Sequence, residues 1–111
     1  MKRIDVSSRM SQGVVHGDTV YLAGQVADGA GVGEQAKGIV DKIDRVLAEA
    51  GTDKSKVLSA QVWLTDIATF DEFNAVWDAW VTPGSPPARA CVEAKLAAPQ
   101  YNVEVMVIAA I

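Results

Sequence analysis

Apolar and polar residues change their spacing several times along the 111-residue chain. Residues 2–6, 10–15 and 20–23 are predicted to form three short strands near the start. The segment 16–19, His-Gly-Asp-Thr, is a turn signal between the second run and the third. These residues therefore favour a β-hairpin preceded by one more strand.

Two later segments follow a helical period instead. Between residues 33 and 50 the apolar positions recur every three or four residues, and Gly51 stands where a helix-ending glycine belongs. A second helix is expected from Thr69 to Val81, with Thr69 and Glu72 fitting a capping box. The predicted apolar stripes are Ala36, Ile39, Ile43, Val46, Leu47 and Ala50 in the first helix and Phe73, Val76, Trp77, Trp80 and Val81 in the second.

Three further strands complete the pattern, at residues 57–66, 88–96 and 102–111. The last two are expected to pair antiparallel through the connection at 97–101. The order β-β-β-α-β-α-β-β favours an α+β fold, a mixed sheet with two helices on one face. The length fits one domain over residues 1–111, because two separate cores would not fit in it.

The last strand is apolar on both faces. One face carries only small aliphatic residues, and on the other Glu104 is followed by Met106, Ile108 and Ala110. If the helices cover one face, nothing in the chain remains to cover the second. We therefore expect another subunit to cover it.

Charge and composition limit the classes of function and the cellular locations that fit the chain. Fourteen acidic residues against ten basic ones give a net charge of −4, and the basic residues are scattered, which weighs against nucleic acid as the main partner. No apolar run approaches the roughly 20 residues of a membrane span, and no apolar segment follows the basic pair at residues 2–3. The single cysteine favours a reducing compartment, so we expect a cytoplasmic protein.

Candidate chemistry gathers on the last two strands. Arg89 and Cys91 share one face of their strand, with Ala90 and Val92 on the other face, which we expect to be the core side. If the strands pair, Glu104 falls near Cys91 on the neighbouring strand. An arginine fork binds a carboxylate, and a carboxylate in apolar surroundings can act as a base or hold a water. Arg89, Cys91 and Glu104 would then form a site for a small carboxylic acid that undergoes hydrolysis.

Simpler interpretations stand beside this one. Arg89 and Glu104 can pair with each other across the strands, and Cys91 can be a small buried apolar residue. Asn74, off the apolar face of its helix, can be a solvated residue. Gly24 can simply end its strand or can expose its backbone N–H to a ligand. One histidine, His16 in a turn, and one cysteine give no zinc-site spacing.

The sequence also resembles a known family. Pro87 to Leu96, then Pro99, then Val103 to Ala109 is closely similar to the C-terminal motif of the RidA/YjgF family of reactive intermediate deaminases, also described as endoribonuclease L-PSP-like. Residues 11–13, 18–25 and 73–75 match the family as well, so the resemblance covers nearly the whole chain. The stretch from Trp77 to Val81 is similar to the YoaB-like branch.

This resemblance implies a chorismate-mutase-like fold and a homotrimer with clefts between subunits. It also implies hydrolysis of 2-imino acids, such as 2-iminopropanoate, to 2-keto acids and ammonia, without a metal or organic cofactor. Arg89 matches the arginine that grips the substrate carboxylate, and Glu104 matches the acid that positions water. The other matches are Cys91 in the pocket wall, Gly24 as a backbone contact to the carboxylate and Asn74 in the cleft.

Two positions depart from the family pattern. Met10 stands where the family has a cleft tyrosine, and Ala23 where a serine is common. Neither side chain can donate a hydrogen bond, which leaves open a trimer that binds a small carboxylate without turning it over. Some relatives are labelled endoribonucleases, but the acidic charge balance argues against RNA cleavage.

Overall fold

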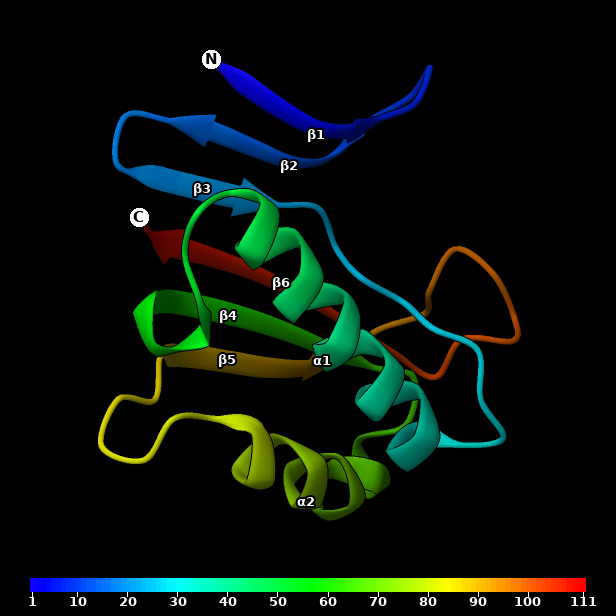
Figure 1. Cartoon of the computed structure of the whole chain (residues 1–111). Coiled ribbons are helices and arrows are strands. Elements are labelled where there is room, and N and C mark those ends of the chain that lie inside the picture. Colours follow the sequence, from blue (N-terminus) through cyan, green and yellow to red (C-terminus); the bar gives the residue numbers. More distant parts are fainter.

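All 111 residues are described by the computed structural model, in which six strands form one sheet and two α-helices pack on one side of it (Figure 1). The order of the elements agrees with the expectation from the sequence. They are β1 (Lys2–Val6), β2 (Ser11–His16), β3 (Thr19–Leu22), α1 (Val32–Glu49), β4 (Val57–Leu64), α2 (Phe70–Trp80), β5 (Ala88–Glu93) and β6 (Val103–Ala110), with short 3-10 turns η1 (Lys54–Lys56) and η2 (Ile67–Thr69).

The sheet order is β1-β2-β3-β6-β4-β5, which corrects one expectation. β5 and β6 are not neighbours, because β4 lies between them. β4 pairs antiparallel with β6 and parallel with β5, so β5 forms one edge of the sheet. The connection after β5 crosses the end of β4 and brings β6 between β4 and β3, and sequence adjacency alone gives no sign of that crossing.

The alternation on β6 separates the two faces as expected. Val103, Val105 and Val107 are fully or almost fully buried under α1, while Glu104 and Met106 lie on the opposite face, half-buried. The buried stripe of α1 completes this side, and 22 apolar residues form one connected core. We call the side of the sheet away from the helices the open face.

The helix ends follow the sequence only in part. Gly51 directly follows the cap of α1 with φ +87°, a conformation that glycine adopts without strain. The predicted capping box is wrong: the Thr69 hydroxyl donates to the Asp66 carbonyl. The Glu72 carboxylate accepts instead from the backbone N–H of Gly33, at 2.8 Å. Glu72 thus ties the start of α2 to the first turn of α1.

The open face remains without cover in the single chain. Tyr21 and Val92 are about half exposed there, at 46% and 50%, and Met106 and Ile108 are only partly buried. This arrangement agrees with the expectation of an apolar second face. Neither helix is long and apolar enough to span a membrane.

Two isoleucines test how far the core stabilises the fold. Ile39 on α1 is completely buried, whereas Ile67 in η2 is 46% exposed. Ile39→Ala should lower the free energy of unfolding by roughly 2–5 kcal/mol, because it leaves a cavity beneath the sheet. Ile67→Ala should change it by less than about 0.5 kcal/mol. Denaturant unfolding followed by circular dichroism measures both, and equal losses would contradict the described core.

Candidate functional site

The candidate residues lie in two groups on opposite faces of the sheet. Arg89 is level with Ala60 of β4, and Cys91 is level with Val62, so both face the helices. Ala90 and Val92, expected on the core side, are exposed on the open face together with Glu104. The expected patch of Arg89, Cys91 and Glu104 on one face is therefore wrong. The error arises because both faces are apolar, which leaves the parity of β5 undetermined.

Arg89 occupies the space between β5 and α2. Its guanidinium donates a hydrogen bond of 2.8 Å to the side-chain carbonyl of Asn74. Its Cζ atom lies 5.7, 5.8 and 5.3 Å from the ring centroids of Phe70, Phe73 and Trp77. Cation–π attraction and the Asn74 bond fix the orientation of the side chain. Of its five N–H donors, most remain free for a ligand.

The spacing of aromatic residues in α2 is the sequence feature that indicates the aromatic surroundings of Arg89. Phe70, Phe73 and Trp77 are three and four residues apart, so they share one side of the helix. Assigning the apolar stripe to the core alone is incomplete, because the same rings enclose the arginine. Asn74 stands beside them and is half-buried against Arg89 rather than simply solvated.

Cys91 is partly buried and packs against the core from the edge strand. Burial raises the pKa of the Cys91 thiol, and the positive charge of Arg89 only partly opposes this rise. A raised pKa keeps the thiol protonated at neutral pH and makes it a poor nucleophile. Its position fits a wall residue beside Arg89.

Glu104 lies on the open face, one strand beyond β4 and level with Trp63. Its carboxylate packs directly against Gly24, where an added Cβ would lie 2.9 Å from the Glu104 Cδ atom. Paired backbone bonds between Gln25 and Val105, of 2.8 and 3.1 Å, hold this approach in place. The carboxylate has no hydrogen-bond or ion-pair partner within the chain, so it is free to bind water or a ligand.

Met10 and Ala23 lie at the ends of β2 and β3, on the side of β6 away from β5. Met10 precedes β2, is 48% exposed, and its backbone is held by the Ser7 hydroxyl. Ala23 follows β3, and its N–H donates to the carbonyl of Gln12. Both lie across the sheet from the β5 edge, so one chain does not bring Met10 or Ala23 near Arg89.

The alternative of an Arg89–Glu104 ion pair is wrong for the single chain. The ion pairs of the structure are those of Arg45 with Asp5 and Glu49, at 2.9 and 3.5 Å. Arg89 and Glu104 point to opposite sides of the sheet. They can act on one ligand only if a second copy of the chain supplies one of them.

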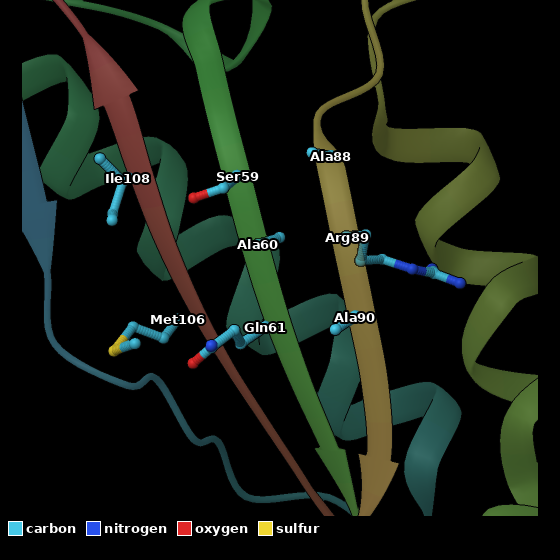
Figure 2. Close-up of a pocket in the computed structure, with 8 residues that line it drawn as sticks. All are labelled: Ser59, Ala60, Gln61, Ala88, Arg89, Ala90, Met106 and Ile108. Atoms are coloured by element: carbon cyan, nitrogen blue, oxygen red, sulfur yellow. The ribbon is translucent and has the colours of Figure 1, made fainter.

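A shallow pocket of about 320 Å³ lies on the open face over β4, β5 and β6. Figure 2 shows Met106, Gln61 and Ser59 along one side of it, while the Arg89 side chain points away toward α2. Arg89 therefore contributes little but backbone to this pocket. No cluster of three or more potential metal ligands occurs in the chain.

The mixed sheet, the two helices on one side and the edge strand that carries Arg89 define a protein of the chorismate-mutase-like α+β fold. The family model described as Endoribonuclease L-PSP matches residues 1–111, and the chain belongs to this family, which includes the RutC and YjgF proteins. The resemblance found in the sequence is thus confirmed.

Individual relatives cover almost the whole chain. A RutC family protein of Haemophilus influenzae is 42% identical over 112 residues, covering 98% of this chain and 97% of its own. The RutC family protein YoaB of Escherichia coli is 39% identical over 110 residues, covering 98% and 96%. The crystal structure of a YjgF family member from Neisseria meningitidis superimposes with a TM-score of 0.97 at 42% identity, covering 98% of this chain and 92% of the other.

Gly24 offers a direct test of the Glu104 position. Gly24→Ala should displace the Glu104 carboxylate by about 1 Å or more, because the new Cβ would overlap it. The free energy of unfolding should change by no more than about 1 kcal/mol, since a flexible side chain can move aside. The control is Gly31→Ala, where the nearest atom lies 3.7 Å away. A crystal structure of Gly24→Ala with Glu104 unmoved would contradict the described packing.

Proposed function

We propose that this protein hydrolyses small 2-imino acids to 2-keto acids and ammonia in a cleft between two subunits of a homotrimer. One observation supports this most strongly: Arg89 is held by Asn74 and three aromatic rings with most of its donors free. The family likeness supports the same chemistry, because Arg89 and Glu104 both fall within the motif that the resemblance covers.

The carboxylate of the substrate binds Arg89. A guanidinium binds a carboxylate through two parallel hydrogen bonds, which fix both the position and the plane of the acid. The surrounding rings lower the local polarity and strengthen that attraction. The backbone N–H of Gly24, from the neighbouring subunit, adds a second contact to the carboxylate.

The neighbouring subunit also supplies Glu104. An apolar open face on one copy and an exposed β5 edge on another are surfaces that association would bury. Placing the edge of one copy over the β3–β6 region of the next brings Arg89 of one chain toward Glu104 of the other. Repeating this contact around a three-fold axis closes the ring.

The reaction needs little activation, because the carbon of an imine is already electrophilic. Glu104 takes a proton from a bound water as the water oxygen bonds to the imine carbon, the C=N π pair moves to the nitrogen, and the nitrogen receives the proton that Glu104 took up. In the resulting amino alcohol, Glu104 transfers the hydroxyl proton to the nitrogen, the C–N bond breaks, and ammonia leaves as the carbonyl forms and the carboxylate is restored. Positioning and the unpaired carboxylate supply the catalysis.

A second candidate function is a trimer that binds a small carboxylate without turnover. Met10 and Ala23 favour it, because neither side chain can donate a hydrogen bond to a substrate in the cleft. Both functions need Arg89 to bind the carboxylate, whereas only hydrolysis needs Glu104 to position a water. Imine-hydrolysis assays therefore separate them.

The Arg89→Ala variant tests the carboxylate grip. An amino-acid oxidase generates imino acids in the assay, and semicarbazide competes for them. We expect kcat/KM to fall about 100-fold or more, because a charge-assisted pair is lost. Arg45→Ala, which removes an exposed arginine of α1 paired with Asp5, should retain wild-type activity. Full activity in a folded Arg89→Ala protein would refute the proposal, and no activity in the wild type would select the binding function.

Mixed trimers test the division of the site between subunits. Arg89→Ala and Glu104→Gln should each be nearly inactive alone. Co-expressed with separate tags and purified through both, they should recover roughly a third of the wild-type activity, since every closed ring that contains both variants has one interface with two intact partners. If both groups came from one chain, no site in such a trimer would be intact, and activity would stay at the level of the single variants.

A further inference from the structure

The largest hollow of the molecule lies between α1 and α2, on the side of the sheet away from the open face. It has a volume of about 550 Å³, which is within the range of small-molecule sites. Figure 1 shows the two helices on the same side of the sheet. We call this hollow the helix groove; its wall comes from α1, α2 and η1.

The floor of the helix groove is apolar, and two polar groups near it are hydrogen-bonded within the chain. Its apolar lining residues are Val40, Ala75, Val76, Ala79 and Trp80. The Trp80 indole N–H donates to Asp44 at 3.0 Å. At the other end, Glu72 accepts from the Gly33 N–H at 2.8 Å. A bound molecule therefore meets a surface that favours hydrocarbon over polar groups.

Two ammonium groups stand at the rim without a partner. Lys37 on α1 and Lys54 in η1 line the groove, and neither side chain makes an ion pair or a hydrogen bond within the chain. Lys54 Nζ lies 5.8 Å from the centroid of the Trp80 ring, so a cation is held over the apolar floor. The carboxylates of Asp44 and Glu72 also face this region, but each is bonded to a neutral N–H rather than to a lysine.

We propose that the helix groove is a binding site for an apolar monocarboxylate, with its acid group between Lys37 and Lys54 and its hydrocarbon body on the floor. Unpaired cations above an apolar surface select a ligand that has one negative end and a hydrophobic remainder. The ligand preferred by the groove differs from the ligand proposed for Arg89, which is a small acid whose carboxylate binds the planar guanidinium. The two sites therefore take different acids.

The groove stays accessible whatever covers the other side. The surface proposed for subunit contact is the open face with the β5 edge, and the helix groove lies opposite the open face. Its occupation depends on neither Arg89 nor Glu104. Ligand binding in the groove is therefore independent of imine hydrolysis.

Titration with naphthalene-2-carboxylate, followed by calorimetry and by amide NMR shifts, tests the proposal on the full chain. We expect saturable binding with the largest shifts at Lys37, Val40, Ala79 and Trp80. Lys37→Gln and Lys54→Gln should each weaken binding about two- to fivefold, because each removes one exposed charge pair. The variant that combines Lys37→Gln with Lys54→Gln should bind the acid weakly. The neutral naphthalene-2-carboxamide should bind the wild type about as weakly.

Matched variants separate binding in the groove from binding elsewhere on the chain. Lys56→Gln removes an exposed lysine of the same short helix that does not line the groove and should bind like the wild type. Ala79→Trp fills the groove from an exposed helix position and should abolish binding with all charges kept. Arg89→Ala should leave it unchanged, and pyruvate should give no shifts in the groove. Absence of groove shifts with the naphthoate, shifts centred on Arg89, or equal binding of acid and amide would overturn the proposal.

Discussion

The pairing of β4 with β6 on one side and β5 on the other determines where every candidate side chain points. Residues level with one another across paired strands share a face, so the burial of Val62 between Val105 and Cys91 assigns all three to the helical side. The next row, Trp63 with Glu104 and Val92, then lies on the open face. Arg89 and Glu104 are separated by this constraint alone, and no rearrangement of side chains within one chain can join them.

Arg89 and Glu104 differ in how far the surrounding residues restrain their side chains. Arg89 is immobilised: an amide, three rings and the edge strand restrict its rotamers, so little side-chain entropy remains to be lost when a carboxylate binds. Glu104 is left unpaired beside a glycine that gives it room. A restrained cation and an unpaired anion on opposite faces of one chain are the arrangement that the proposed cleft between two copies requires.

The sequence predicts the elements and the helical stripes well, because these depend on local spacing. The order of strands is different: β6 enters between β3 and β4, and nothing near residues 97–101 signals that crossing. The sequence also does not predict which face of the sheet Arg89 occupies, because Ala90 and Val92 on the open face are as apolar as core residues. The motif likeness picks out Arg89 and Glu104 together, whereas only the three-dimensional pairing places them on opposite faces.

Helix α2 contacts Arg89 on one side and lines the helix groove on another. Its residues Phe73, Asn74 and Trp77 turn toward Arg89, and Ala75, Val76 and Ala79 line the helix groove. On the groove side Ala75 and Ala79 leave space beside Trp80, and on the other side Phe73 and Trp77 support the arginine. The side chains of α2 are thus packed closely around Arg89, whereas two alanines leave an open hollow beside Trp80.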